Sequence, residues 1–548
     1  MLTQARHNET ADHPNPVSSC YNQTMADQKH KTLIAWFLFI LLLCIYHGDG
    51  DFQVSSDAIP NVYLPVSVLN DGNLSFSPEE FPFMFWQDED ALKKDGEFEN
   101  LLKTQEVFPG KGLFPFYYLT KTRYPGICVN SYGIGAGLTA LPVFAVLKAV
   151  YPGYANNPSL LWRAGKLVAS LCVAASVVLV FLTACYFLAP WSAVLVALAY
   201  GLGTCVWSDI SQTLWQQSPN VLFLALGAWA LVRNEQTREF SSAWSGAALG
   251  MAVLCRPTSA LAVIAVAAYL AIVRRRELPG FVLGGMPFAA IWLGYNLYYF
   301  GDLLYLGQAA TSGKLLALEV TGSPDLWQTP FWEGAVGVLF SPARGIFIYS
   351  PFLLFTLPFA YMLFKDGRYR ILAPFFVAAL AMIIMTFKWY SWWGGWTFGY
   401  RLSVDAMPLL ALMLIPGVEL IYSRKWTGAV FTAALAWSIG VQVLGAFSYN
   451  LSGWNNRPFY DVSMGNKYSR IPVDYAKKTH LIDRLRRKYG NKITVRRVSG
   501  NIDLKQNRYR LMSLADNPIS YYLMYFRESR RQRKEQIKNW LKSTFNNQ

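Results

Sequence analysis

The stretch LIAWFLFILLLCIYHGDGDFQVSSD (residues 33–57) joins an apolar run to a cluster of three aspartates. The run contains no charged residue, and about 20 mostly apolar residues in a helix cross the hydrocarbon core of a bilayer. We therefore expect a membrane helix over about 32–47. Asp49, Asp51 and Asp57 then lie where the chain leaves the membrane.

The composition places the whole chain in the membrane class. Of its 548 residues, 53% are hydrophobic, 16% aromatic and only 15% charged, whereas soluble domains have about 25% charged residues. We predict an all-α polytopic membrane protein with about eleven transmembrane helices. The expected spans are 32–47, 162–189, 191–206, 219–233, 243–255, 258–273, 281–300, 346–364, 371–387, 405–422 and 426–447.

The orientation follows from the Lys and Arg residues near the helix ends, which favour the cytoplasmic side. Short basic loops such as RNEQTREF (233–240) and RRRELPG (274–280) are then cytoplasmic, as is the tail 1–31. The long loops 48–160 and 301–345 lie outside. This alternation requires that residues 132–152 do not span the membrane, so we expect interfacial helices in the first outer loop.

Residues 448–548 form a separate basic region after the transmembrane domain (32–447). This region holds 22 of the 49 Lys and Arg residues but only 7 of the 34 Asp and Glu residues, so it accounts for the whole net charge of +15. An odd number of helices places it outside the cell membrane. We expect anionic lipids or envelope polysaccharides as its partners, or a purely structural role, and no nucleic acid.

Two interpretations compete for Asp57. Polar residues are common where a chain leaves a bilayer, and this simpler interpretation explains Asp49 and Asp51. Asp57, however, precedes IPNVYLPVSVLNDG (59–72), whose apolar residues have near-helical spacing. A carboxylate held by such a helix at the outer interface could act as a general base for a sugar hydroxyl.

Cations on the same side suggest a phosphate ligand. Lys121 and Arg123 precede Tyr124, Pro125 and Gly126; they are either snorkelling interfacial cations or donors for a lipid-linked phosphate. Arg256 interrupts 27 otherwise apolar residues, and an Arg at that position usually faces a cavity or a partner.

A tryptophan-rich loop, KWYSWWGGWTFGYR (388–401), gives a further indication. An interfacial aromatic belt is the simpler interpretation. Four tryptophans around a Gly-Gly turn also suit a sugar ring, with a phosphate held by Lys388 and Arg401. Arg344 lies in another segment on the same side.

Taken in order, several segments resemble the GT-C superfamily of integral-membrane glycosyltransferases, over most of residues 32–450. The chain also resembles, more distantly, protein O-mannosyltransferases and lipid A aminoarabinose transferases. The segments are Asp57 with NVYLPVSVLNDGNL (61–74), RYPG (123–126), YGLGTCVWSDISQTLWQQSP (200–219), LCRPTSAL (254–261), YNLYYFGD (295–302), SPARGIFIYSPFLL (341–354) and WWGGWTFGYRL (392–402).

The resemblance implies roles for particular residues. Asp57 matches the catalytic carboxylate, with Asp49 as the alternative, and relatives often carry a second acid where this chain has Asp209. Gln216 and Gln217 replace the acid or His expected nearby, which leaves a divalent cation open and no cofactor certain. The expected donor-phosphate ligands are Lys121, Arg123, Arg256, Arg344, Lys388 and Arg401. The expected sugar and acceptor ligands are Tyr124, Asp209, Trp392, Trp393, Trp396 and Tyr400.

The implied function is an inverting transfer of a sugar from a polyprenyl-phosphate carrier to an envelope glycan, lipid or protein. The resemblance places the enzyme in the bacterial inner (plasma) membrane, with its active site on the periplasmic side. A transporter or flippase of lipid-linked sugars remains an alternative, as does a glycan polymerase or ligase. Neither the sugar nor the acceptor follows from the sequence.

Overall fold

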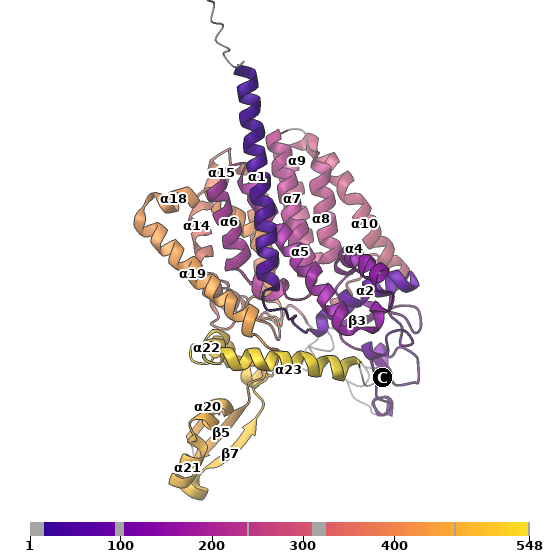
Figure 1. Ribbon diagram of the computed structural model, residues 1–548. Helices are drawn as coiled ribbons and strands as arrows, with labels where there is room; N and C mark the ends of the chain where they lie inside the picture. The colour runs from indigo at the N-terminus through magenta and orange to yellow at the C-terminus, as the bar shows by residue number, and fades with distance from the viewer. Residues whose placement is uncertain (1–15, 94–102, 238–240, 310–324, 465–466, 546–548) are drawn as a thin grey trace, which may run out of the picture.

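The computed structural model describes residues 16–93, 103–237, 241–309, 325–464 and 467–545 (Figure 1). The expected second outer loop, 301–345, and the tail, 1–31, fall partly outside these ranges. The α-helices are α1 (Pro16–His47), α2 (Ile59–Asp71), α4 (Gly135–Val150), α5 (Pro158–Ala184), α6 (Pro190–Gly203), α7 (Gln217–Thr237), α8 (Ser242–Cys255), α9 (Ala260–Val273), α10 (Leu278–Phe300), α12 (Phe331–Phe340), α13 (Ile346–Tyr349), α14 (Thr356–Phe359), α15 (Met362–Lys365), α16 (Ala373–Lys388), α17 (Met407–Ala411), α18 (Val418–Ser423), α19 (Lys425–Ser448), α20 (Val473–Lys478), α21 (Leu481–Tyr489), α22 (Pro518–Met524) and α23 (Phe526–Phe545).

The strands are short and antiparallel. Two two-stranded sheets belong to the first outer loop: β1 (Phe85–Gln87) pairs with β2 (Leu113–Pro115), and β3 (Leu119–Lys121) pairs with β4 (Cys128–Asn130). A three-stranded sheet in the C-terminal region has the order β6 (Lys467–Pro472), β5 (Phe459–Met464), β7 (Thr494–Val498).

Five helices in the described part of the chain are long and apolar enough to cross a membrane. They are Gln28–Tyr46, Pro158–Ala184, Arg275–Phe300, Arg370–Lys388 and Lys425–Ser448. Six further apolar helices are shorter, among them α6, α8 and the segment Pro257–Val273. The chain is therefore a mostly helical integral membrane protein, as predicted from the sequence, whereas the number of eleven spans stays a prediction.

Two of the expected spans are broken rather than continuous. Residues 346–364 consist of α13, a 3-10 turn at Pro351–Phe355, α14 and α15, and residues 405–422 contain α17, a second 3-10 turn and α18. Prolines stand at the starts of these turns (Pro351) and helices (Pro408). Proline has no N–H for the preceding helical turn and clashes with it, so each begins a new segment.

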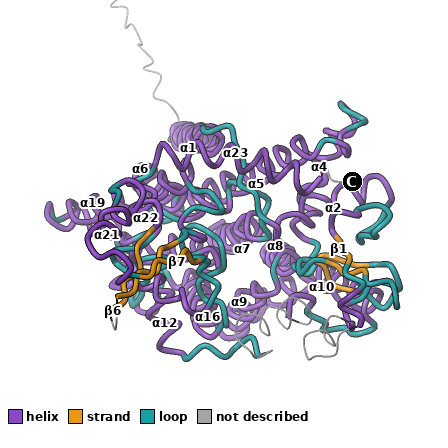
Figure 2. The backbone as a smooth tube through the Cα atoms, turned by 90° about the horizontal axis from the view of Figure 1, so that it is seen from below, coloured by secondary structure: helices purple, strands orange, loops and turns teal. Residues whose placement is uncertain are grey.

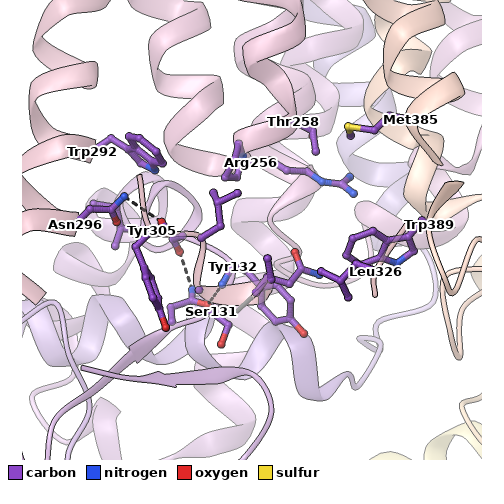
Figure 3. Close-up of a pocket in the computed structure, with 18 of the residues that line it drawn as sticks. Ser131, Tyr132, Arg256, Thr258, Trp292, Asn296, Tyr305, Leu326, Met385 and Trp389 are labelled. Atoms are coloured by element: carbon purple, nitrogen blue, oxygen red, sulfur yellow. Dashed lines mark hydrogen bonds between the residues drawn. The ribbon is translucent and has the colours of Figure 1, made fainter. Parts of the chain in front are cut away.

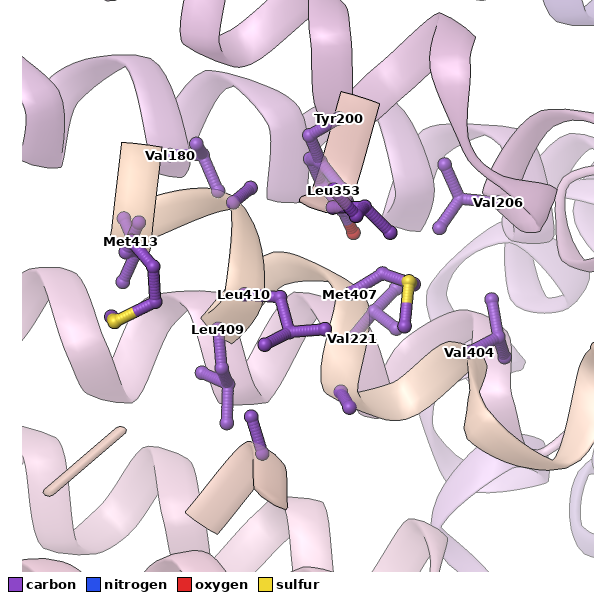
Figure 4. Close-up of a cluster of buried hydrophobic side chains, with 14 of the residues drawn as sticks. Val180, Tyr200, Val206, Val221, Leu353, Val404, Met407, Leu409, Leu410 and Met413 are labelled. Atoms are coloured by element: carbon purple, nitrogen blue, oxygen red, sulfur yellow. The ribbon is translucent and has the colours of Figure 1, made fainter. Parts of the chain in front are cut away.

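The core of the helical bundle is a tightly packed apolar cluster. Val180 of α5, Tyr200 of α6 and Val221 of α7 surround Met407 and Leu410 of α17 (Figure 4), and all of them are buried. Helices in a membrane associate through such close van der Waals packing, because lipid tails are as apolar as the side chains. This cluster fixes the ends of the helices from which the candidate site is built.

The first outer loop packs more tightly than an interfacial segment needs. Every residue of α2 from Ile59 to Ser67 is buried within the protein, whereas its position along the outer interface stays a prediction. The burial is due to close packing: Leu64 lies against Gly137 of α4, and Val62 lies against Gly165 of α5. The missing side chains allow this approach. In contrast, α4 keeps exposed apolar residues, as an interfacial helix does.

The C-terminal region lies at the end of the bundle that carries α2 and β3 (Figure 1). Helix α23 crosses beneath the bundle, and Figure 2 shows it running past the ends of α1 and α5. Its Trp540 packs edge-to-face on Trp162 of α5, with ring centroids 4.8 Å apart. The sheet β6-β5-β7 with α20 and α21 projects away from the bundle below α23 (Figure 1).

Candidate active site

Asp57 stands in a 3-10 turn (Ser56–Ala58) directly before α2. Its Oδ1 accepts a hydrogen bond of 2.6 Å from the Tyr117 hydroxyl, and its Oδ2 accepts one of 2.9 Å from Nη1 of Arg401. The side chain of Asp57 is 20% exposed and that of Arg401 13% exposed. The structure thus brings together the expected catalytic carboxylate and one expected phosphate ligand, from segments 344 residues apart.

Arg401 is held in place by the tryptophan-rich loop. Its Nη2 donates to the carbonyl of Gly394 at 3.1 Å, and its guanidinium lies 4.1 Å from the ring centroid of Trp215. Gly394 and Gly395 have φ values of +75° and +70°, in the left-handed region that favours glycine. The Gly-Gly turn therefore orients the carbonyl of Gly394 toward Arg401.

Asp209 is the second carboxylate near Arg401. It is buried in a π-helical turn (Val206–Ile210), and its Oδ2 accepts a hydrogen bond of 2.8 Å from Thr397. Burial raises the pKa of Asp209 to about 6, against the opposing effects of Arg401 and Thr397. The sequence predicted Asp209 as a sugar or acceptor ligand; the structure places it behind Arg401.

A cavity of about 340 Å³ lies beside this cluster (Figure 3). Seven of its lining residues are aromatic: Tyr132, Trp292, Tyr295, Phe300, Tyr305, Trp327 and Trp389. Tyr132 lines the cavity and lies close to Asp57. Burial and the Asp57 carboxylate together raise the pKa of its hydroxyl well above the usual range. Ligand sites in proteins combine such apolar walls with a few polar groups.

Two polar groups in the wall are suited to a ligand. Arg256 lies at the break between α8 and the next helical segment, and its guanidinium points toward Met385 and Trp389 (Figure 3). The hydroxyl of Tyr295 is buried and has no hydrogen-bond partner among the described residues. A buried donor without a partner is unfavourable, while Arg256 gives the cavity wall a group suited to acceptor oxygens.

Arg256 has its own carboxylate partner. It forms an ion pair with Oδ2 of Asp405, and Oδ1 of Asp405 accepts a hydrogen bond of 2.8 Å from Asn220. Ser259 in turn donates to Asn220 at 2.7 Å. Arg256 is therefore positioned by a buried polar network that the sequence did not reveal, since Asp405 lies within an expected span.

Arg344 lies apart from the cavity, in contrast to its predicted role as a phosphate ligand. It is 1% exposed, and its donors bind the carbonyls of Trp393, Ala343 and Gly395 and Oδ1 of Asn455. With each of its nitrogens hydrogen-bonded within the protein, Arg344 instead joins the tryptophan-rich loop to the C-terminal region.

The expected aromatic ligands also face the C-terminal region or the core. Trp393 donates to Asp503 at 2.9 Å and Trp396 to Asn501 at 3.0 Å. Trp392 is buried against Gly337, and Tyr400 is buried with its hydroxyl 2.6 Å from that of Ser350. These contacts favour structural roles. Trp389, another of the four tryptophans of this loop, lines the cavity.

The remaining predicted cations lie outside the cavity wall. Arg123 is exposed and stacks on Tyr124, to whose hydroxyl it donates at 2.9 Å. Lys121 ends β3, and Lys388 is exposed at the end of α16, one residue before Trp389. Lys388 directly precedes Trp389, which lines the cavity. Tyr124 lies with Arg123 on the surface.

Asp49 belongs to a different cluster. It is 6% exposed and forms ion pairs with Lys166 of α5 at 2.9 Å and with Arg533 of α23 at 3.1 Å. This arrangement favours a role in docking the C-terminal helix over the alternative catalytic role. In the sequence, Lys166 is a charge in a mostly apolar segment and Arg533 is one of many charges in a basic segment. Neither pattern indicates that these residues bind Asp49.

No group of three or more His, Cys, Asp or Glu side chains within the described ranges is placed to hold a metal ion. The groups nearest the cavity are instead single carboxylates, each paired with an arginine: Asp57 with Arg401, and Asp405 with Arg256. This pattern is suited to binding an oxyanion between arginines and to proton transfer by a carboxylate.

Parts of the chain are similar to known proteins. Residues 162–295 match the family model described as dolichyl-phosphate-mannose-protein mannosyltransferase. No curated protein matches the chain. Among solved structures, ArnT from Cupriavidus metallidurans bound to undecaprenyl phosphate has 11% identity and a TM-score of 0.41, covering 78% of this chain and 66% of that chain.

The archaeal oligosaccharyltransferase AglB from Archaeoglobus fulgidus, in complex with an inhibitory peptide and a dolichol-phosphate, has 12% identity and a TM-score of 0.35. The match covers 71% of this chain and 55% of that chain. The chain thus spans less than two thirds of the length of either solved chain. The family-model match confirms, over residues 162–295, the predicted resemblance to the GT-C superfamily of membrane glycosyltransferases.

Proposed function

We propose that the protein transfers a sugar, with inversion, from a polyprenyl-phosphate carrier to an envelope glycan, lipid or protein. The observation that carries this proposal is the pairing of Asp57 with Arg401 and Tyr117 beside an aromatic cavity that Arg256 lines. The matched family supports a lipid-linked mannose as the kind of donor, because its description names dolichyl-phosphate-mannose.

The donor would enter the cavity with its phosphate toward Arg256. Arginine offers planar pairs of N–H donors that fit phosphate oxygens. The aromatic side chains offer faces for the sugar and the first isoprene units. Because the leaving polyprenyl phosphate gains negative charge, cations already in position would stabilise the transition state.

Asp57 would act as the general base. Its two oxygens are oriented by Tyr117 and Arg401, and each keeps a lone pair for the hydroxyl proton of the acceptor. As the acceptor oxygen bonds to the anomeric carbon, the bond from that carbon to the phosphate oxygen breaks, and the proton passes to Asp57. Attack opposite to the leaving phosphate inverts the configuration.

The predicted sidedness places this chemistry on the extracytoplasmic face of a bacterial inner membrane. The short basic loops lie at the opposite ends of the helices from Asp57, which is the arrangement expected when they face the cytoplasm. The proposed domains follow: a cytoplasmic tail (1–31), a transmembrane domain (32–447) and an extracytoplasmic C-terminal region (448–548).

The test is sugar transfer by the purified full-length protein in nanodiscs, with an undecaprenyl-phosphate sugar and an envelope extract as acceptor. Release of undecaprenyl phosphate and labelling of the acceptor are both measured. We expect Asp57→Asn to lower the rate by about 10²–10⁴-fold, since an amide cannot accept the proton. Asp71→Asn is the matched control, because Asp71 is an exposed aspartate at the end of α2.

Two outcomes would contradict the proposal. A wild-type rate for Asp57→Asn would remove Asp57 from the mechanism. Movement of the labelled donor across proteoliposomes without release of undecaprenyl phosphate would indicate a transporter instead.

A further inference from the structure

A second, polar groove of about 920 Å³ lies between α23 and the projecting C-terminal sheet. Its rim extends from Asn450, just after α19, to Trp540, which packs on Trp162 of the bundle. The groove therefore begins at the face of the transmembrane domain and continues onto the projecting part, where Figure 1 shows α20 and β7 below α23. None of the expected site residues lines it.

The floor of the groove is rigid. Arg457 donates to both oxygens of Asp474, at 2.9 and 2.7 Å, and to Asp516 at 3.0 Å. Its guanidinium also lies 5.2 Å from the ring centroid of Tyr521 and 5.9 Å from that of Tyr525. These charges are satisfied within the protein, so they shape the groove without requiring a ligand.

The wall formed by α23 offers amides and carboxylates. Gln532, Glu535 and Asn539 are exposed there, with Gln536 between them. Amides can donate and accept at once, and carboxylates accept, which suits the hydroxyl pairs of a sugar chain. Trp540 and the two tyrosines add aromatic surface for sugar rings.

The opposite wall is basic. Lys477, Lys478 and Arg497 line the groove, and all three are exposed. None of the three makes an ion pair with any residue in the described ranges. The exposed basic side chains of α21 and the following loop extend this positive surface beyond the groove. An acidic group on a ligand would be held at this wall.

We propose that this groove binds an acidic glycan, with its acidic groups toward α20 and β7 and its hydroxyls toward α23. On the proposed function this glycan is the acceptor chain, held beside the transmembrane domain. Carboxylates on one wall disfavour a densely charged polyphosphate such as nucleic acid. The wall formed by α20 and β7 projects away from the helical bundle (Figure 1), and so also from the membrane around that bundle.

The test is binding of a galacturonic acid hexamer to the full-length protein in nanodiscs, measured by calorimetry, with maltohexaose as the neutral control. We expect the acidic hexamer to bind and salt to weaken it. The triple variant Lys477→Gln, Lys478→Gln, Arg497→Gln should weaken binding by about tenfold or more, since three charge-assisted contacts are lost. Arg486→Gln, Arg487→Gln, Lys488→Gln removes the same charge from α21, outside the groove, and should change binding by less than about threefold.

Several outcomes would overturn the proposal. They are no binding of the acidic hexamer, equal binding of both hexamers, or an equal loss in the two triple variants, which would indicate unspecific attraction of charge. Tighter groove-dependent binding of anionic vesicles or of a single-stranded oligonucleotide would assign the groove to those ligands instead. Binding of the hexamer by a protein that transfers no sugar would retain the groove and overturn only the proposed function.

Discussion

Arg401 lies between two carboxylates of unlike environment. Asp57 is partly exposed and accepts a hydrogen bond from Tyr117, while Asp209 is buried and accepts one from Thr397. Arg401 thus donates a hydrogen bond to Asp57 and also acts on the buried Asp209, whose pKa it lowers against the effect of burial. At the scale of single residues, then, the same residue types have different roles that depend on solvent and partners.

The Arg256 ion pair allows binding and stability to be separated. Arg256→Ala should weaken donor binding, and it should also lower the free energy of unfolding by about 3–5 kcal/mol, since Asp405 is left buried without its partner. Adding Asp405→Asn should restore most of the stability, because the amide keeps its bond to Asn220, but not the donor affinity. Thermal unfolding and donor titration on the same detergent samples check both, and restored donor affinity in the double variant would contradict the phosphate role.

Asp209 gives a prediction about pH. Its folded-state pKa of about 6 lies above the usual value of 3.8, so the protonated carboxyl is favoured by folding. The protonated Asp209 therefore stabilises the folded protein fully below about pH 4. This stabilisation is lost as the pH rises through 6, by about 1.4 kcal/mol per pH unit between the two pKa values. Asp209→Asn should remove this dependence: relative to the wild type, the variant should gain in melting temperature as the pH rises from 5 to 7.5. A constant difference between the two would contradict the raised pKa.

At the scale of elements, the lengths of the apolar runs predicted most of the membrane helices but not their partners. Apolar runs predicted α5, α9, α10, α16 and α19 closely, because length and hydropathy determine a membrane helix. For α2, the near-helical spacing of apolar residues predicted a helix along the outer interface. Its packing depends on Gly137 and Gly165, which lie in other helices, and a sequence does not show which glycine faces which leucine.

The docking of α23 gives a prediction at this scale. Asp49→Asn leaves Lys166 and Arg533 buried without their carboxylate, so it should destabilise the protein by about 3–5 kcal/mol. Sugar transfer per folded molecule should stay near the wild-type value. The matched control is Asp51→Asn, whose pair with Lys534 is looser, at 4.0 Å, and largely exposed on the lysine side; it should cost at most about 1 kcal/mol. Loss of turnover by a folded Asp49→Asn protein would instead support Asp49 as the base.

At the scale of the whole molecule, the sequence predicted which loops gather at one end of the bundle. Asp57 pairs with Arg401, which also acts electrostatically on Asp209, while Arg256 lines the neighbouring cavity. The aromatic faces of Trp393 and Trp396 suit a sugar, and no pattern in the chain indicates that Asp503 and Asn501 bind them instead. Contacts between a membrane domain and a separate polar region have no periodicity from which they could be predicted.

The orientation of the molecule can be tested by thiol labelling in intact cells. Asn73 is exposed beyond α2, at the end of the bundle that carries Asp57, and Gly367 is exposed in the basic loop before α16, with open space around its Cα. In a background with Cys44→Ala, a membrane-impermeant maleimide should label Asn73→Cys directly, and Gly367→Cys only after the membrane is opened. The parent without either new cysteine measures labelling of the remaining thiols. The reverse pattern would place Asp57 in the cytoplasm, where nucleotide-sugar donors are available, and the proposal of a lipid-linked donor on the outer face would then fail.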